Sequence, residues 1–266
     1  MRIRNQFQMG GAALLRGLNF GRRGSVALPI AMILFFTAGA TAETTNALSD
    51  AEIQGCKLAR GLYWARPETN FTHTGILRIR NGKGENSEFP FELKIEVGPT
   101  NWNSFYTVIF TNNVDKIYEL YIGHVNNQRN RYGFRGRKGT IMSPFFDSDF
   151  WIADLGLEFF HWPEQRILKH EMRRGRACKV LESTNPNLSS TNAVPPICYS
   201  RVVSWIDNES GGIVQAEAYD FKNKLLKEFA PKSFKKVNGQ WELQEMEIRN
   251  VQTGSRTRLE FDLEKE

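Results

Sequence analysis

The first amphipathic pattern in the chain has the period of a helix. From Asp50 to Trp64 apolar residues recur at loosely helical spacing. Ser49 and Glu52 fit a capping box, in which hydroxyl and carboxylate satisfy free N–H groups at a helix start. Pro67 follows as a stop signal. The pattern predicts one helix at the start of the folded region.

From about residue 70 the period changes to two, which is typical of strands. Phe89, Phe91 and Leu93 alternate with charged or polar residues, and residues 256–263 alternate in the same way. Less regular strand candidates are residues 72–80, 104–111, 115–122, 131–138, 166–173, 177–183, 198–207, 212–220, 224–230 and 240–250. Most are joined by short turns, which force antiparallel neighbours. The expected fold class is mainly β with a few helices (α+β), a meandering antiparallel sheet curled into a barrel or half-barrel.

Residues 145–162, here called the aromatic segment, break the alternation. Large apolar side chains dominate them, and Asp149 is expected to cap a short helix. Such a segment must be buried against the sheet, either as ordinary core that plugs the barrel or as a movable lid over an apolar cavity. On the second interpretation the lipid-binding lining includes Phe150, Trp151, Leu155, Leu157, Phe159 and Phe160.

Residues 1–42 have the features of an export signal. An arginine-bearing stretch precedes an apolar run from Val26, which ends in the cleavage pattern Ala40-Thr41-Ala42. The run is shorter than the roughly 20 residues that span a bilayer. We expect a cleavable signal peptide over 1–42, cleavage after Ala42, and one periplasmic domain over 43–266. A signal-anchor helix, the Sec or twin-arginine route, and a start at Met9 stay open.

The charge of the chain is concentrated in that signal. The formal net charge is +6, but residues 1–42 hold five arginines and no other charged residue. Residues 43–266 then carry 30 basic and 29 acidic residues, a net charge of +1. A nearly neutral mature part argues against a nucleic-acid partner. The basic run 169–176 is interpreted as strand-and-turn surface, with contact to lipid phosphates or an acidic protein left open.

Two cysteines lie on successive strand candidates. Cys178 and Cys198 flank a polar connection, and in an oxidising compartment a disulfide between them is plausible. It would close a loop of about 20 residues and stabilise the fold by about 3 kcal/mol. The alternative is two buried thiols. Cys56 lies on the apolar face of the predicted helix and is expected to be a small residue of the protein core.

Catalytic motifs are absent from the sequence. The histidines are widely spaced, and no metal-binding pair, nucleophile elbow or phosphate-binding loop is found. We therefore expect no metal, no cofactor and no catalysis. His161, beside Trp162, is the one candidate for an envelope hydrolase, although a hydrogen-bonded structural histidine is favoured there.

From about residue 140 onward the chain carries a resemblance to a known family. The stretches that carry it are residues 143–162, 178–186, 199–207, 211–229, 235–243 and 247–263. Within them, the motifs of one branch of the family correspond to Tyr199–Asp207, Ala216–Phe229 and Thr253–Phe261. The sequence resembles the outer-membrane lipoprotein-sorting proteins (LolA/LolB-like), and specifically a divergent LolA-like branch. The resemblance implies an incomplete antiparallel β-barrel whose helices cover an apolar cavity for the acyl chains of lipoproteins.

Taken together, the sequence predicts a monomeric, non-catalytic periplasmic carrier of lipids. Its partners would be acyl chains of lipoproteins or other lipids, with an envelope receptor or membrane surface at the point of release. The alternative is a structural or interaction module of the envelope whose barrel is filled by its own side chains. An envelope hydrolase is the third possibility.

Overall fold

The computed structural model describes residues 48–109, 117–126, 128–136, 139–186, 198–237 and 239–263. The predicted signal peptide, residues 1–42, lies outside these residues. Among the described residues, no helix combines the length and the hydropathy that a membrane span requires. No group of His, Cys, Asp and Glu side chains in the same residues could hold a metal ion.

Helix α1 (Asp50–Tyr63) begins at the predicted capping box. The Ser49 backbone N–H donates to Glu52 Oε2 at 2.7 Å, and the Glu52 N–H donates to Ser49 Oγ at 3.4 Å. A Cβ atom on Gly55 would lie 2.6 Å from the backbone of Gln165 and Arg166. The helix therefore packs with its backbone directly against strand β6 (Glu164–Arg173), an approach that only glycine allows.

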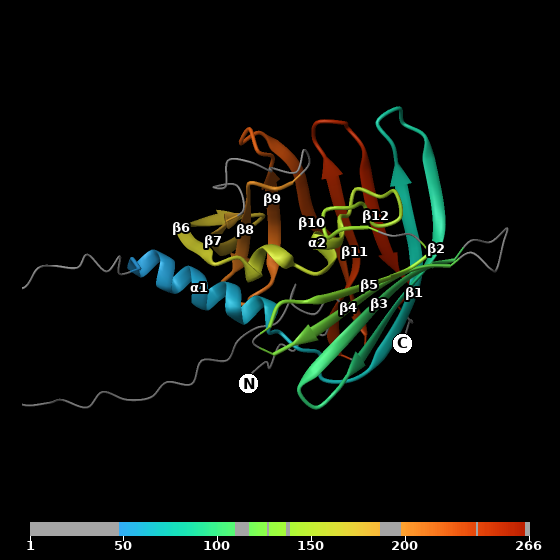
Figure 1. The fold of residues 1–266 in the computed structure, drawn as a ribbon, viewed down its shortest axis with the longest axis horizontal. Helices are drawn as coiled ribbons and strands as arrows, with labels where there is room; N and C mark the ends of the chain where they lie inside the picture. The colour runs from blue at the N-terminus through green and yellow to red at the C-terminus, as the bar shows by residue number, and fades with distance from the viewer. Residues whose placement is uncertain are drawn as a thin grey trace, which may run out of the picture.

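The described residues form twelve strands in one antiparallel sheet (Figure 1). The strands are β1 (Phe71–Arg80), β2 (Asn86–Val97), β3 (Asn101–Ile109), β4 (Ile117–Val125), β5 (Arg131–Arg135), β6 (Glu164–Arg173), β7 (Arg176–Thr184), β8 (Arg201–Asp207), β9 (Ile213–Tyr219), β10 (Leu225–Val237), β11 (Gln240–Asn250) and β12 (Arg256–Phe261). Their spatial order is β5-β4-β3-β2-β1-β12-β11-β10-β9-β8-β7-β6. Two meanders thus join where β1 pairs with β12, and the sheet is not closed.

The predicted strands agree with this sheet, because each candidate range overlaps one strand. The largest difference is in β10, which was expected to end at residue 230 and continues to Val237. Register shifts between Pro231 and Phe234 let β10 stay paired with β11 past the proline. A bulge of this kind accommodates a residue without an N–H group in a long strand. The expectation of an open, curled antiparallel sheet is confirmed.

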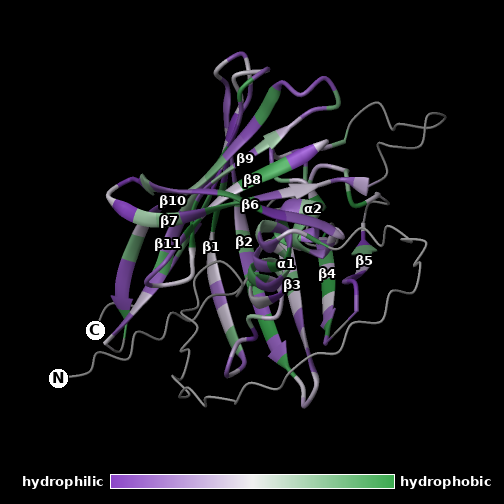
Figure 2. Ribbon diagram, turned by 90° about the vertical axis from the view of Figure 1, so that its left-hand side faces the viewer, coloured by the Kyte–Doolittle hydropathy of each residue, from purple (hydrophilic) through white to green (hydrophobic). Residues whose placement is uncertain are grey.

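The sheet curves around the remaining elements. In Figure 2 helices α1 and α2 (Ile152–Leu155) lie within this curve, and the 3₁₀ helix η2 (Glu158–His161) connects α2 to β6. One large apolar cluster joins the concave face to α1 and to the aromatic segment. Phe145 packs edge-to-face on Phe91 and Tyr118, with ring centroids 6.4 and 5.3 Å apart. The beginning of the aromatic segment is therefore ordinary core.

The predicted disulfide is wrong, because Cys178 and Cys198 are both free and buried. Strand β7 pairs with β8 so that Cys178 lies opposite Asp207, the last residue of β8. Cys198 precedes Arg201, the first residue of β8. The length of β8, about 20 Å at roughly 3.3 Å per residue, thus separates the two thiols. A disulfide needs Cα atoms about 4.4–6.8 Å apart, so the register of the hairpin excludes the bridge.

Candidate functional site: an apolar cavity

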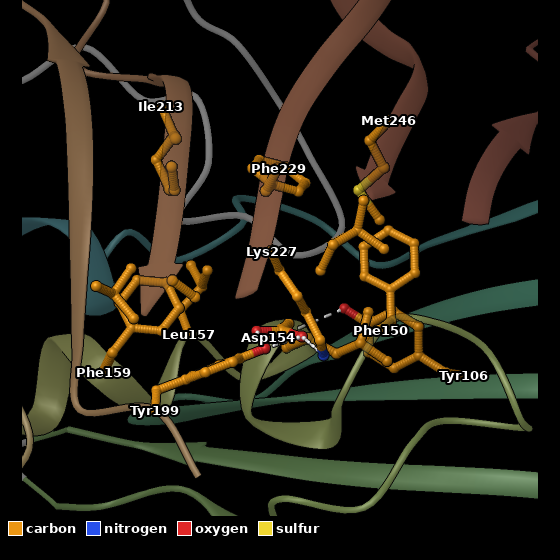
Figure 3. A pocket seen from close by; sticks show the side chains of 15 residues that line it. Tyr106, Phe150, Asp154, Leu157, Phe159, Tyr199, Ile213, Lys227, Phe229 and Met246 are labelled. Atoms are coloured by element: carbon orange, nitrogen blue, oxygen red, sulfur yellow. Dashed lines mark hydrogen bonds and ion pairs between the residues drawn. The ribbon is translucent and has the colours of Figure 1, made fainter. Parts of the chain in front are cut away.

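An apolar cavity lies between the aromatic segment and the concave face of β8–β11 (Figure 3). Its lining consists of Tyr106, Phe150, Asp154, Leu155, Leu157, Phe159, Tyr199, Val202, Ile213, Ala216, Ala218, Lys227, Phe229, Met246 and Ile248. The free volume is about 40 Å³, which is small against the roughly 300–1,000 Å³ of ligand pockets. In this conformation the protein's own side chains nearly fill the space.

Four of the six residues that the sequence assigned to the lining do line the cavity: Phe150, Leu155, Leu157 and Phe159. The other two lie behind them. The Trp151 ring stacks on Tyr199 with centroids 4.4 Å apart, and Phe160 packs against Phe159 at 4.5 Å. Both rings therefore pack against lining residues without lining the cavity themselves.

The aromatic segment folds back on itself at the cavity. Pro144 and Trp151 form an isolated antiparallel bridge, and the Ala153 N–H donates to the Ile141 carbonyl at 2.8 Å. Leu157 has a left-handed backbone with φ of 50°, a conformation that costs free energy for a residue other than glycine. This backbone turns the chain from α2 into η2 and directs the apolar side chains toward the sheet.

Asp149 does not cap α2, contrary to the prediction. The helix begins at Ile152, and the Asp149 carboxylate accepts hydrogen bonds from Ser255 and from Thr257 on β12. The Asp149 N–H also donates to Thr257 Oγ1 at 2.9 Å. Burial raises the pKa of the Asp149 carboxyl above its usual value. These bonds fix the aromatic segment to the middle of the sheet.

Lys227 is the functional candidate that sequence reasoning missed. Its side chain is 2% exposed, and its Nζ donates to the Asp149 carbonyl at 2.7 Å. The same Nζ lies 3.5 Å from Asp154 Oδ2 and 3.6 Å from the centroid of the Trp151 ring. Burial lowers the pKa of Lys227 to about 8. A strand residue therefore holds the aromatic segment by three different contacts, of which Figure 3 shows the one to Asp154.

A signal for Lys227 was present in the sequence. The residue lies two positions before Phe229, which a period of two assigns to the same face of β10. A lysine in place of an apolar residue at such a position indicates a buried charge with a partner. The partner could not be identified, because it lies 73 residues away along the chain.

Asp154 completes the polar contacts at this end of the cavity. Its carboxylate accepts a hydrogen bond from the Tyr199 hydroxyl at 2.8 Å and one from the Trp151 N–H at 2.7 Å. Burial and the charge of Asp154 raise the pKa of Tyr199 well above its usual value, so the phenol remains a neutral donor. With its ammonium partner Lys227 the carboxylate is satisfied without water. The arrangement is suited to holding two elements together.

His161 does not line the cavity. Its ring stacks on Tyr63 of α1 with centroids 4.2 Å apart, and its Nε2 atom has no hydrogen-bond partner among the described residues. Burial lowers the pKa of His161 to about 4. Nearby His124 stacks on Trp102 at 3.5 Å, and burial lowers its pKa to about 3. Both histidines are thus neutral packing residues, and the expected hydrogen bond of His161 at Nε2 is not found.

Comparisons with known proteins agree with this architecture. A family model described as "Uncharacterized protein" matches residues 135–264, slightly less than half of the chain. No curated protein matches the sequence. Among solved structures, the chain is similar to a DUF1329 family protein from Desulfovibrio piger, with 19% identity over 80% of this chain and 92% of that chain and a TM-score of 0.63.

Two further structures share the fold. A putative outer membrane lipoprotein-sorting protein domain from Vibrio parahaemolyticus is 22% identical over 79% of this chain and 91% of that chain, with a TM-score of 0.61. A LolA superfamily protein from Nitrosomonas europaea is 13% identical over 82% and 96%, with a TM-score of 0.54. The chain therefore has the fold of the LolA-like lipoprotein-sorting proteins, and the resemblance seen in the sequence is confirmed at the level of the fold.

Proposed function

We propose that this protein is a periplasmic carrier that binds acyl chains of lipoproteins or other lipids and has no catalytic activity. The observation that carries the proposal is the cavity between the curved sheet and the aromatic segment. Apart from Asp154 and Lys227, its lining is aliphatic or aromatic. Burial of each methylene group in such a lining contributes about 0.8 kcal/mol. The predicted signal peptide and the shared fold support the location and the ligand class.

Uptake in this proposal requires residues 150–160 of the aromatic segment to move as a lid. The present free volume of about 40 Å³ does not accommodate a whole acyl chain. Opening would break the hydrogen bond of Lys227 to the Asp149 carbonyl and its ion pair with Asp154. Both contacts join the lid to β10, so they oppose opening directly. A bound chain would replace them with apolar contacts to β8–β11.

A cavity-filling variant tests the proposal. Ala218, on β9, lines the cavity, and Ala218→Phe would place a ring in the space that an acyl chain needs. We expect wild-type protein to take up a fluorescent fatty acid from solution and Ala218→Phe to lose this uptake. Circular dichroism would verify that the variant is folded.

The matched control is Ala177→Phe, because Ala177 is an exposed alanine on the neighbouring part of the sheet, in β7. It should take up the fatty acid like wild type. Lipid extraction and mass spectrometry of protein purified from the periplasm give a second measurement. If wild-type protein carries no lipid and takes up no fatty acid, the carrier proposal is refuted.

The small free volume favours one alternative, a structural or interaction module whose barrel is filled by its own side chains. On that alternative the aromatic segment never leaves the sheet, and Ala218→Phe would change only stability. An overpacked core of this kind typically costs about 1–3 kcal/mol. Uptake by the wild-type protein decides between the two functions.

A further inference from the structure

A second hollow lies at one end of the sheet and is here called the edge groove. It has a volume of about 500 Å³ and is lined by Arg174, Arg176, Asp207, Ser210, Gly212, Ile213, Val214, Pro231, Lys232, Phe234 and Trp241. Ile213 also lines the central cavity. The edge groove and the central cavity therefore share one lining residue.

The edge groove exists because β10 is longer than its neighbour β9. The pairing of β10 with β9 ends at Phe229, whereas its pairing with β11 continues to Val237. Pro231, the second residue past Phe229, has no N–H group to offer a further strand. Its carbonyl accepts a hydrogen bond from Arg174 Nη1 at 3.4 Å. The turn between β6 and β7 thus lies across the open side of β10.

Two exposed aromatic side chains continue the apolar surface of the cavity into the edge groove. Trp241 is 48% exposed and Phe234 is 37% exposed. Phe234 pairs with Leu243, which is buried in the main core, and opposite residues in an antiparallel pair share a face. Trp241 lies two residues from Leu243 on the same strand and so also shares that face. The concave surface therefore ends in a pair of rings at the tip of the β10–β11 hairpin.

Basic side chains border these rings. The edge groove is lined by three cations, Arg174, Arg176 and Lys232, and by one carboxylate, Asp207. Arg176 pairs with Asp207 at 3.0 Å, and Lys232 pairs with Glu247 at 2.7 Å. Arg176 also lies 3.4 Å from Glu209, so carboxylates compensate both of these cations. Arg174 is the lining cation that no carboxylate of the described residues pairs, and its guanidinium donates to a backbone carbonyl instead. Exposed tryptophan beside arginine and lysine is the combination that binds the interface of an anionic bilayer.

The geometry points to the edge groove as the surface that docks this protein on an anionic phospholipid membrane. Trp241 and Phe234 enter the headgroup region, and Arg174, Arg176 and Lys232 face the lipid phosphates. An acyl chain that leaves the central cavity past Ile213 then emerges at the bilayer. The inference rests on the proposed function for this route, but the contact with the membrane can be measured without it.

Vesicle sedimentation tests the docking surface. Protein purified without detergent should bind vesicles of equal parts phosphatidylglycerol and phosphatidylcholine, bind pure phosphatidylcholine vesicles weakly, and release the anionic vesicles at high salt. The double variant Trp241→Ser, Phe234→Ser should bind roughly tenfold more weakly. Arg174→Gln alone should weaken binding roughly fivefold. Because these side chains are exposed, thermal unfolding should be nearly unchanged.

The matched control is Phe221→Ser. Phe221 is 51% exposed, and Lys222 Nζ lies 5.4 Å from its ring centroid, so it also combines an exposed ring with a cation. It lies in the turn between β9 and β10, at the other end of these strands. Vesicle binding should be as strong as in wild type. Equal loss in Phe221→Ser would show unspecific adsorption and would overturn the inference.

Uptake of a fluorescent fatty acid from solution separates this inference from the carrier function. The double variant should take up the fatty acid normally, because the central cavity is unaltered. Two outcomes overturn the docking surface and leave the carrier function intact. One is fatty-acid uptake by the wild type without vesicle binding, and the other is vesicle binding that the double variant retains. Vesicle binding by a protein that carries no lipid and takes up no fatty acid refutes the carrier function and leaves the docking surface.

Discussion

At the scale of single residues, Lys227 is where the sheet and the aromatic segment are held together. An ammonium group that is 2% exposed loses its hydration, and only a hydrogen bond and an ion pair of good geometry compensate for this loss. The hydrogen bond to the Asp149 carbonyl and the pairing with Asp154 provide both. Lys227 therefore adds little to the net free energy of unfolding. Its contacts instead favour one closed arrangement of the aromatic segment on the sheet.

Lys227→Met should accelerate ligand uptake. The substitution keeps the length of the side chain and removes the hydrogen bond to Asp149, a charge-assisted bond of about 1.5–3 kcal/mol, so we expect uptake to become about tenfold faster. Stopped-flow fluorescence with a fatty-acid probe measures the rate, and Lys224→Met, at an exposed position just before β10, is the matched control. A folded variant with slower uptake would instead show that Lys227 contacts the ligand.

The two stacked histidines should make the protein less stable in acid. Burial lowers the pKa of His161 to about 4 and that of His124 to about 3, whereas an unfolded histidine has a pKa of about 6.5. Below pH 6.5 the unfolded state binds more protons, so stability that is complete above pH 6.5 is lost as the pH falls toward 4.

His161→Phe keeps a ring against Tyr63 and removes one of the two titrations. From pH 7 to pH 4.5 we expect the free energy of unfolding of wild type to fall by about 2–3 kcal/mol more than that of the variant. Urea unfolding at both pH values measures the difference. An equal fall in both proteins would contradict the lowered pKa of His161.

At the scale of elements, the contact between α1 and β6 depends on one missing side chain. A Cβ atom on Gly55 would lie 2.6 Å from the backbone of Gln165, and backbone atoms cannot rotate away as a flexible side chain can. Gly55→Ala gains about 1 kcal/mol of helix propensity but forces α1 off the strand, at a typical cost of about 1–3 kcal/mol. We expect a net loss of stability in thermal unfolding.

The control for this contact is Gln54→Ala, one residue earlier on the exposed side of α1. It improves helix propensity slightly without touching β6, so its unfolding temperature should equal or exceed that of wild type. A Gly55→Ala protein that is as stable as Gln54→Ala would mean that α1 has room to shift on the sheet.

The elements could be predicted from the sequence because their signals are local. The capping box of Ser49 and Glu52 and the alternation of Phe89, Phe91 and Leu93 involve residues a few positions apart, and they located α1 and the strands. The disulfide failed because it depends on register. Cys178 was correctly placed on a strand, whereas Cys198 lies three residues before β8. Only the pairing of Cys178 with Asp207 shows that the two thiols lie at opposite ends of β8.

At the scale of the whole molecule, the open sheet is continuous, but its concave side packs against core in one part and faces the cavity in another. Around β2–β4 the rings of Phe91, Tyr118 and Phe145 pack as permanent core. Over β8–β11 the same surface faces the cavity, and small side chains such as Ala216 and Ala218 leave space there. The sequence showed an aromatic segment that must be buried, but it could not show which part packs on the core and which part covers a cavity. That division depends on how far the sheet curves.

Hydrogen exchange can detect this division in the intact protein. If residues 150–160 form a lid, a bound acyl chain keeps the lid away from β10, so amides that are protected by local bonds, such as that of Ala153, should exchange faster with ligand than without. Strands β8–β11 should exchange more slowly, because the ligand stabilises them by mass action. Amides of α1, which contacts β6 and η2, provide the internal reference and should change little.

Slower exchange in both the lid and the strands would instead mean that the ligand is enclosed beneath a closed segment. The cavity would then have to widen by movement of the sheet, and the contacts of Lys227 would persist in the bound state.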